Sequence, residues 1–350
     1  MEYRTLGRTG LRVSEIGLGG EWFNGLTAQE SAAIIDAAQE KGINYIDIFM
    51  PQAPTRSNLG VALEGRREKF IIQGHLCTVF EDGQYTRTRD IEKTRRSFED
   101  LLERLHTDYI DVGMIHYVDS EEDFRTVFEG PVLSYAKVLK ENGVIRHIGM
   151  SSHNPHIALK AVESGVIDVL MLSINPAYDM EAAETDIYDL MEFKGMEKSG
   201  LVVDEARQKL YSACEAAGVA ITVMKPLGAG TLLKAESSPL RRGHDGPPVH
   251  PILPGPQRRQ GGHCGLPHGG RGAGGRQILR HSPGGAELLP YLQRRKRHLY
   301  DRSVHVLQPL PALPCPHQHC GCNQVPGSGR PAGFCAGDRG TALLVPLRHG

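Results

Sequence analysis

Three side chains that could take part in proton transfer stand at or near the ends of short apolar runs. Asp47 lies near the end of INYIDIF, His75 near the end of FIIQGHL, and His116 near the end of YIDVGMIHY. An imidazole gains and loses a proton close to neutral pH, so both histidines can serve as acid or base. These residues are candidates for acid–base chemistry if the fold brings the three runs together.

The runs that carry these residues are predicted to be strands of a parallel sheet. Short β-branched apolar runs alternate with long amphipathic stretches, which is typical of repeated strand–helix units. Their continuous apolar character predicts strands that are buried on both faces. The predicted strands are Glu15–Gly19, Ile43–Phe49, Phe70–Leu76, Tyr109–Tyr117, Val144–Ser151, Ile167–Ile174 and Val219–Lys225.

Helices are predicted between these strands. From Thr88 to His106 apolar residues recur at helical spacing and charged residues occupy the other side. Thr27 and Glu30 form a capping-box pattern, and Gly42 can end the helix that follows. Seven such units predict an α/β fold of the (β/α)8 TIM-barrel type, incomplete because an eighth strand is needed for closure. A doubly wound open sheet is the alternative, weakened because no GxGxxG follows the first strand.

In such a barrel the functional side chains lie at the C-terminal ends of the strands. Beside the acid–base candidates, this rim would carry Ser151 and Ser152 after the fifth strand. The stretch 226–230 would follow the seventh strand. All of these positions are therefore predicted to meet at one end of the barrel.

Several long motifs carry a resemblance to a known family. They are YRTLGRTGLRVSEIGLGG, GINYID, DYIDVGMIH, GVIRHIGMSSHNP and VMKPLGAG, in this order. Through them, residues 3–235 resemble the aldo-keto reductase superfamily, in the branch with a C-terminal iron–sulfur (4Fe–4S) segment. The resemblance implies hydride transfer between NADP(H) and a small-molecule carbonyl substrate, with an acid that protonates the developing alkoxide.

Only half of the catalytic set implied by the resemblance is present. Asp47 and His116 match the family's Asp and His, whereas Gln52 stands where the family has its acid Tyr. His75 stands where the family has the Lys that modulates that acid. An amide is no practical acid near neutral pH, so His116, with His75 nearby, is the predicted donor. The alternative is that Asp47, His75 and His116 are hydrogen-bonded rim residues without a catalytic role.

Cofactor-binding residues also carry over from the resemblance in part. Ser151 and Ser152 align with residues that hold the nicotinamide carboxamide. Leu227, Gly228 and Gly230 align with the loop along the pyrophosphate, where glycine lets the backbone come close.

Two positions depart from the family's cofactor site. Met171 and Ile174 stand where the family usually has a Gln and an aromatic residue that stacks on nicotinamide. Another electron carrier, such as a flavin, is therefore the alternative to NADP(H).

The composition changes near residue 240. Residues 1–240 carry 25 basic and 37 acidic side chains, whereas residues 241–350 carry 15 basic and 4 acidic ones. The second part also holds 20 of the 41 glycines and 15 of the 22 prolines, which is typical of disorder. We therefore predict an aldo-keto-reductase-like barrel at residues 1–237 and a basic tail of low order at residues 238–350.

A shift of the reading frame explains this tail more fully than disorder alone. Read one base further on, the codons permitted by His298–Arg330 encode C-x2-C-x2-C-x2-C-P, the pattern of a [4Fe–4S] ligand run. In the same register Pro256–Arg280 permit a strand followed by a V-G-x-R turn, similar to the family's eighth unit. We predict a frame shift near Ser238–Arg241, a cluster in the restored frame only, and impaired activity in this chain.

Other functions of the tail are weaker predictions. The basic run 294–297 points to nucleic acid, but charge runs are mostly solvated. A metal is suggested by Cys315, His317, His319, Cys320 and Cys322, but their spacings match no standard zinc pattern. We expect neither partner. The functional alternatives are an inactive barrel used for binding and a barrel with a nucleic-acid-binding tail. The lack of a long apolar run or secretory signal, and two cysteines in the first 240 residues, predict a cytoplasmic protein without a membrane partner.

Overall fold

Eight parallel strands close into a barrel in the structure, a computed structural model that describes residues 1–183, 185, 187–192, 203–233 and 304–307. Around the barrel the strand order is β10, β11, β12, β3, β4, β5, β8 and β9. In chain order the barrel strands are β3 (Ile16–Gly19), β4 (Tyr45–Ile48), β5 (Ile71–Leu76), β8 (Ile110–Ile115), β9 (Ile145–Ser152), β10 (Val169–Ser173), β11 (Ala220–Met224) and β12 (Val304–Leu307).

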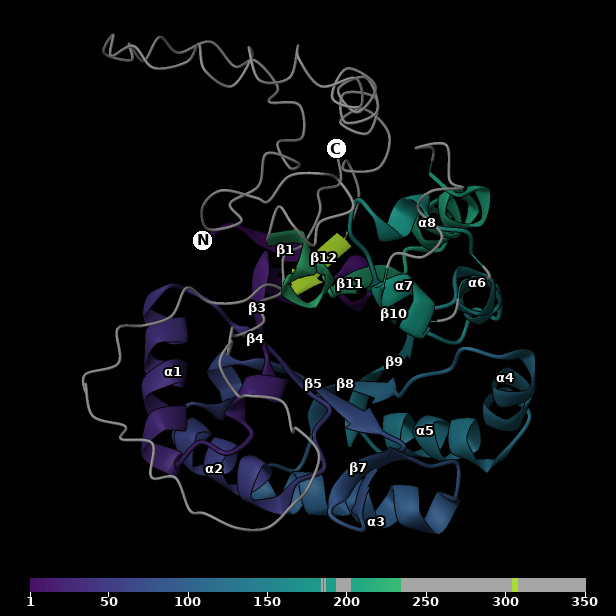
Figure 1. Ribbon diagram of the computed structural model, residues 1–350. Coiled ribbons are helices and arrows are strands. Elements are labelled where there is room, and N and C mark those ends of the chain that lie inside the picture. Colours follow the sequence, from purple (N-terminus) through teal and green to yellow (C-terminus); the bar gives the residue numbers. More distant parts are fainter. Residues whose placement is uncertain (184, 186, 193–202, 234–303, 308–350) are drawn as a thin grey trace, which may run out of the picture.

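Helices surround these strands (Figure 1). They are α1 (Ala28–Glu40), α2 (Ala53–Leu63), α3 (Ile91–Arg104), α4 (Glu121–Phe128), α5 (Pro131–Glu141), α6 (Pro155–Glu163), α7 (Ile187–Met191) and α8 (Glu205–Ala217). The predicted capping box of Thr27 and Glu30 begins α1, and Gly42 follows that helix with a φ of 76°. Among the described helices, none has the length and apolar character that crossing a lipid bilayer requires.

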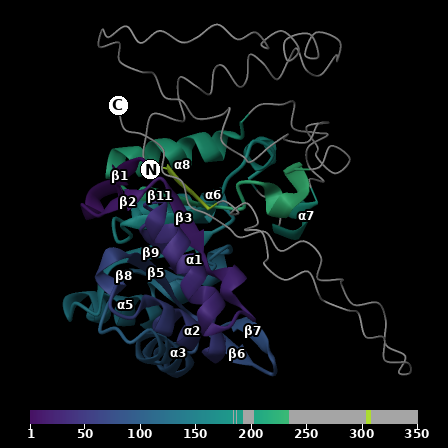
Figure 2. The same ribbon diagram turned by 90° about the vertical axis from the view of Figure 1, so that its left-hand side faces the viewer.

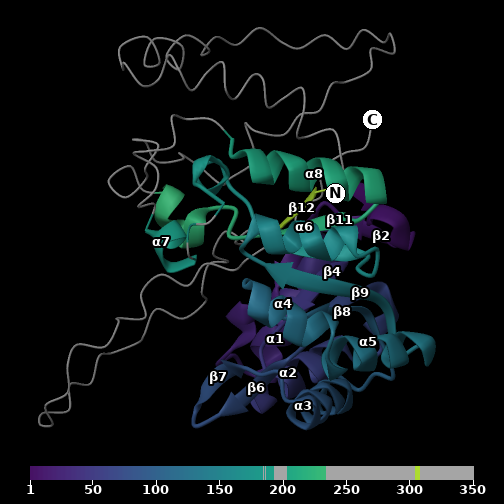
Figure 3. The same ribbon diagram turned by 90° about the vertical axis from the view of Figure 1, so that its right-hand side faces the viewer.

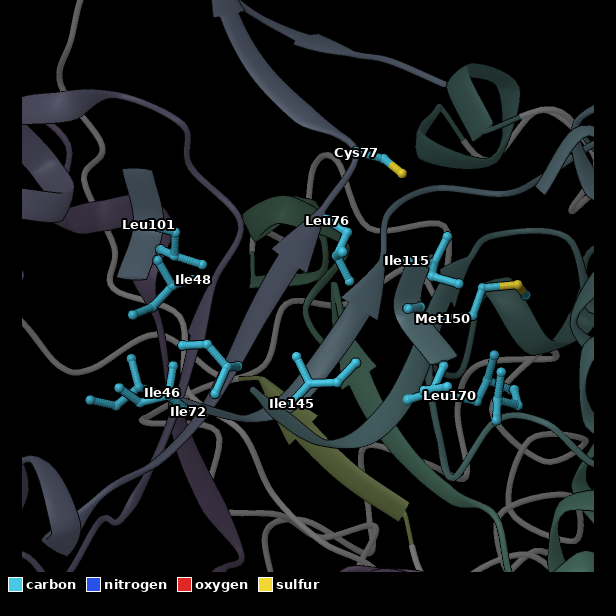
Figure 4. Packing of buried hydrophobic residues seen from close by; sticks show 14 of the residues in the cluster. Ile46, Ile48, Ile72, Leu76, Cys77, Leu101, Ile115, Ile145, Met150 and Leu170 are labelled. Carbon is cyan, nitrogen blue, oxygen red and sulfur yellow. The ribbon is translucent and has the colours of Figure 1, made fainter. Parts of the chain in front are cut away.

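The seven barrel strands from β3 to β11 are largely buried on both faces, as their sequences predict. Outward-facing side chains such as Ile72, Ile145 and Leu170 belong to the large apolar core shared with the helices (Figure 4). Inward-facing side chains such as Val112 and Val169 fill a second, smaller cluster inside the barrel. The alternation of the strand therefore places consecutive residues in two different cores.

All seven strands predicted within residues 15–225 are confirmed, but the barrel is closed rather than incomplete. The eighth position is occupied by β12, which pairs with β11 through Ile221 and Val304 and with β3 through Ile16 and Val306. Without β12, the backbone groups of β3 and β11 would lack partners on one side, and a β-branched segment can satisfy both edges. The prediction that this chain lacks an eighth strand is thereby corrected. The remainder of the predicted tail lies outside the described residues.

Two hairpins accompany the barrel. One is formed by β1 (Tyr3–Thr5) and β2 (Arg12–Ser14), which lie beside β11 and α8 (Figure 2). The other, formed by β6 (Thr78–Glu81) and β7 (Gln84–Arg87), follows β5 directly and lies beside α3 (Figures 2 and 3). Its turn residues, Asp82 and Gly83, have φ values of 51° and 77°, as tight two-residue hairpin turns require.

Candidate active site

The structure brings Asp47, His75 and His116 together at the C-terminal ends of three adjacent strands, β4, β5 and β8. Asp47 Oδ1 lies 2.9 Å from His75 Nε2, and His75 Nδ1 lies 2.7 Å from His116 Nδ1. Asp47 and His75 are almost fully buried, with 3% and 2% of their surfaces exposed. The three residues therefore form a continuous line of hydrogen bonds that leads from the barrel interior to its rim.

A fourth residue extends this line, and sequence reasoning missed it. The hydroxyl of Tyr85, on β7, forms a hydrogen bond with His116 Nε2. The hairpin that carries Tyr85 does have a signal in the sequence, because Asp82–Gly83 separates two short alternating runs. We refer to Asp47, His75, His116 and Tyr85 together as the proton chain.

The hydrogen-bond partners fix the direction of every donor in the proton chain. A carboxylate only accepts, so His75 donates from Nε2 to Asp47 and accepts at Nδ1. His116 must then donate from Nδ1 to His75, which leaves its Nε2 to accept from the hydroxyl of Tyr85. All three donors point toward Asp47 when both imidazoles are neutral.

Two buried polar side chains hold Asp47 from the interior side. Gln73 Nε2 donates to Asp47 Oδ1 over 2.5 Å, and the hydroxyl of Tyr45 donates to Gln73 Oε1 over 2.7 Å. Burial raises the pKa of Tyr45 well above its ordinary value, so it remains a donor. The carboxylate charge is thus satisfied by two N–H donors, one from His75 and one from Gln73.

The surroundings of His116 and Tyr85 favour the neutral forms of these two residues. Burial lowers the pKa of His116 well below its ordinary value, and nearby positive charges lower it further. Those charges belong to Arg89 and Arg87, and to His75 and His153 whenever these rings carry a proton. Burial also raises the pKa of Tyr85 to about 12, so the phenol keeps its proton at neutral pH.

The position of Tyr85 is fixed by contacts at the base of its hairpin. Arg87 Nη1 donates to the carbonyl of Tyr117 over 2.8 Å, and Arg89 Nη1 donates to the carbonyl of His116 over 2.9 Å. The ring of Phe49 stacks on His116 at a centroid distance of 5.7 Å and meets Tyr85 edge-on at the same distance. The hairpin is therefore tied to the segment that carries His116, and Phe49 covers both rings.

Gln52 does not join the proton chain. It is the residue that precedes α2, and its side-chain oxygen is buried without a hydrogen-bond partner among the described residues. The position at which the family has its phenol is therefore occupied by a neutral amide that has no bond to any member of the chain.

The serines predicted to bind the nicotinamide lie at the end of β9, next to the segment after His116. Ser151 Oγ accepts the backbone N–H of Tyr117 over 2.8 Å, and Ser152 Oγ donates to Asp119 Oδ1 over 2.9 Å. Both serines are buried. Among the described residues the hydroxyl proton of Ser151 has no recorded acceptor, so it can serve an incoming carbonyl group.

A second polar cluster lies along the same rim and connects the serines with the loop after β11. His153 Nδ1 lies 2.9 Å from Asp119 Oδ2, and Lys225 Nζ lies 3.3 Å from His153 Nε2. Burial lowers the pKa of Lys225. The predicted pyrophosphate residues follow this lysine: Leu227 is buried, the N–H of Gly228 donates to the carbonyl of Lys225, and Gly230 lies in the turn Gly228–Leu233.

The interior of the barrel contains a polar position that suits a nicotinamide carboxamide. Ser173, at the end of β10, is fully buried, and its hydroxyl has no hydrogen-bond partner among the described residues. Met171 faces the same interior, with its sulfur 3.5 Å from Gln73 Nε2. Since β9 and β10 are neighbours, Ser151 and Ser173 offer hydroxyl groups from adjacent strands.

Within the described residues, no group of three or more His, Cys, Asp or Glu side chains is arranged to hold a metal ion. The cysteine and histidine cluster at 315–322 lies outside these residues.

Comparisons with known proteins match this architecture. Residues 15–250 match the model of the aldo/keto reductase family. The uncharacterized oxidoreductase YqkF of Bacillus subtilis is 30% identical over 176 residues, which cover 49% of this chain and 56% of that protein. The L-galactose dehydrogenase of Arabidopsis thaliana is 30% identical over 182 residues, with the same shares covered. This chain thus spans about half the length of these curated relatives.

The solved structures show the same fold. The aldo-keto reductase AKR11C1 from Bacillus halodurans, in its holo form, superposes with a TM-score of 0.53 and 22% sequence identity. The superposition covers 87% of this chain and 85% of that one.

Proposed function

Because this chain belongs to the aldo/keto reductase family, we propose that it interconverts a small-molecule carbonyl compound and its alcohol with NADP(H), in the cytoplasm. The observation that carries the proposal is the line of hydrogen bonds from Asp47 through His75 to His116 at the barrel rim. Such a line can hold or take up the proton that this reaction requires.

When bound, the dinucleotide supplies the hydride that is added to the carbonyl carbon. The electron pair of the C=O bond moves to oxygen, and this oxygen must then receive one proton. His116 holds or releases that proton, because it is the outer of the two imidazoles. His75 and Asp47 orient His116 and share the charge that a transferred proton brings.

The residues that would hold the cofactor lie in two groups. The hydroxyls of Ser151 and Ser173 would bind the carboxamide, and Ser152 would keep this strand end in place through Asp119. Leu227, Gly228 and Gly230 would lie along the pyrophosphate. The cationic Nζ of Lys225 stands at the start of this loop and would attract its negative charge.

The first test is cofactor binding and turnover by the full chain. We expect NADPH to bind, detected by its fluorescence, and to be oxidised in the presence of aldehydes or ketones, detected by absorbance. His116→Gln should lower turnover at least about a hundredfold, as loss of a general acid or base does, whereas the exposed control His106→Asn should not. Binding of a flavin in place of NADP(H), or no turnover with any carbonyl, would contradict the proposal.

We also propose that residues 238–350 are read out of frame and that this impairs activity. The V-G-x-R turn that would grip the cofactor phosphate occurs only in the shifted reading, so NADPH should bind this chain weakly. The same reading would turn Val304 and Leu307 into the first two cysteines of an iron–sulfur segment. The expected result is an extra or missing base between the codons of Ala235 and Asp245, with iron–sulfur absorbance after repair. A gene and an intact mass that agree with the chain as written would refute this.

A further inference from the structure

We propose that Tyr85 is the residue that exchanges the proton with the substrate oxygen, so that the β6–β7 hairpin supplies the acid and base of the reaction. This inference rests on the proposed function, because it names the group that touches the reacting atoms. It is carried by the position of Tyr85 at the outer end of the proton chain.

The other members of the proton chain offer a substrate no accessible nitrogen or oxygen. Both ring nitrogens of His75 and both of His116 are already engaged within the chain. Asp47 and His75 are, in addition, almost fully buried. A phenol oxygen can donate one hydrogen bond and accept two, so the half-buried Tyr85 can hold His116 and a substrate oxygen at the same time.

The direction of the donors determines how the protons move. In alcohol oxidation the substrate hydroxyl gives its proton to the oxygen of Tyr85, while the proton of Tyr85 moves to Nε2 of His116. The hydride leaves the same carbon for NADP⁺, and the substrate C–O bond becomes a carbonyl. The neutral arrangement of the structure is ready for this step, since the hydroxyl of Tyr85 already points toward His116.

Carbonyl reduction runs the same steps in reverse and needs one more proton in the chain. His116 must first carry a proton on Nε2 and donate it to Tyr85, while Tyr85 gives its own proton to the alkoxide formed by hydride addition. Protonation of His116 is opposed by burial and by the charges of Arg89 and Arg87, and also by His75 and His153 whenever these rings carry a proton. Oxidation should therefore become faster as the pH rises, and reduction should become faster as the pH falls.

Tyr85 requires His116 for this role. Burial makes a tyrosinate at position 85 costly and raises the pKa of the phenol to about 12. A separate, fully formed tyrosinate is thus disfavoured at neutral pH. Transfer between Tyr85 and the substrate is expected to occur together with transfer between Tyr85 and His116. The ties of Arg87 and Arg89 keep the two groups within hydrogen-bonding reach.

The test compares Tyr85→Phe with Tyr109→Phe, which removes a phenol hydroxyl near the opposite end of β8. We expect Tyr85→Phe to lower kcat about a hundredfold or more in both directions, with KM changed by less than about threefold. Tyr109→Phe should leave both values unchanged. In histidine ¹⁵N NMR titrations, Tyr85→Phe should raise the pKa of His116. The substitution removes the hydroxyl that stabilises the neutral ring by donating a hydrogen bond to it.

Each result distinguishes the two proposals. Wild-type protein without turnover overturns the proposed function and, with it, the role of Tyr85. If the wild-type protein turns over and Tyr85→Phe retains or increases this activity, only the role of Tyr85 is overturned. Its phenol then merely covers the site. If Tyr85→Phe does not fold, fluorotyrosine at position 85 keeps the ring and lowers the phenol pKa. The pH profiles must then shift to lower pH, and unchanged profiles refute the inference.

Discussion

Lowering the pH from 7 to 5 adds a proton to the histidines of the unfolded chain, whereas His116 resists protonation in the folded protein. Its folded-state pKa lies well below the ordinary value of 6.5, because its ring is buried and faces His75, His153, Arg89 and Arg87. Its hydrogen-bond partner Tyr85 is neutral in this range. Below pH 6.5 the unfolded state therefore binds more protons than the folded state, and the free energy of unfolding must fall.

The size of this effect follows from proton linkage. One group of this kind costs about 1.4 kcal/mol of stability per pH unit well below pH 6.5, or about 2 kcal/mol between pH 7 and pH 5. Burial lowers the pKa of His153 as well, which adds to the loss, whereas burial raises the pKa of Glu21, which opposes it at the acidic end. A comparison between variants removes both contributions.

The measurement is urea unfolding at pH 7, 6 and 5, followed by far-UV circular dichroism, for wild type, His116→Gln and His106→Asn. Between pH 7 and pH 5, His116→Gln should lose about 2 kcal/mol less stability than wild type. His106 is exposed, and asparagine tolerates its positive φ of 51°, so His106→Asn should follow wild type. Equal losses for wild type and His116→Gln would refute the assignment of a neutral, buried imidazole at this position.

Three further predictions concern the scaffold. Gly60→Ala should destabilise the protein by about 2–3 kcal/mol in urea unfolding, since the added Cβ would lie 1.9 Å from the carbonyl oxygen of Arg104 and force α2 away from α3. Thr27→Ala should cost about 1 kcal/mol in the same assay, because it removes the hydrogen bonds with Glu30 that cap α1. Truncation after Leu233 should cause aggregation in light scattering, because β3 and β11 lose β12; a monodisperse truncated protein would contradict this.

The sequence predicts the strands up to residue 225 because each is a buried apolar run next to an amphipathic helix. Local signals also suffice for the start of α1, where Thr27 and Glu30 form hydrogen bonds with each other. The eighth strand could not be predicted in this way. Val304–Leu307 is a four-residue segment in a region rich in glycine and proline. It becomes a strand because it pairs with the open edges of β3 and β11, which are distant in sequence.

The inner members of the proton chain could be predicted for a similar reason. Once a barrel is assumed, Asp47, His75 and His116 must meet, because each stands at the same end of a neighbouring strand. Tyr85 stands on an additional hairpin outside the strand–helix repeat. The Asp82–Gly83 pair predicts a turn, but no local pattern shows that the turn brings the phenol to His116.

The hydrogen-bond partners of Asp47 also bear on how the site would bind an anionic cofactor. Asp47 is a buried carboxylate, and a lone buried charge would be costly, yet its donors are the side chains of Gln73 and His75 rather than a lysine. The cations nearest to the proton chain, Arg87 and Arg89, are paired with Asp123 and are therefore already partly neutralised. Lys225 precedes the loop at 227–230 in the chain, and its Nζ lies 3.3 Å from Nε2 of His153. Because Asp119 fixes the ring of His153 through Nδ1, the Asp119–His153 pair holds this cation in place without cancelling it by direct contact. Under the proposed function, proton transfer and cofactor charge would therefore fall to two separate hydrogen-bonded lines on one rim.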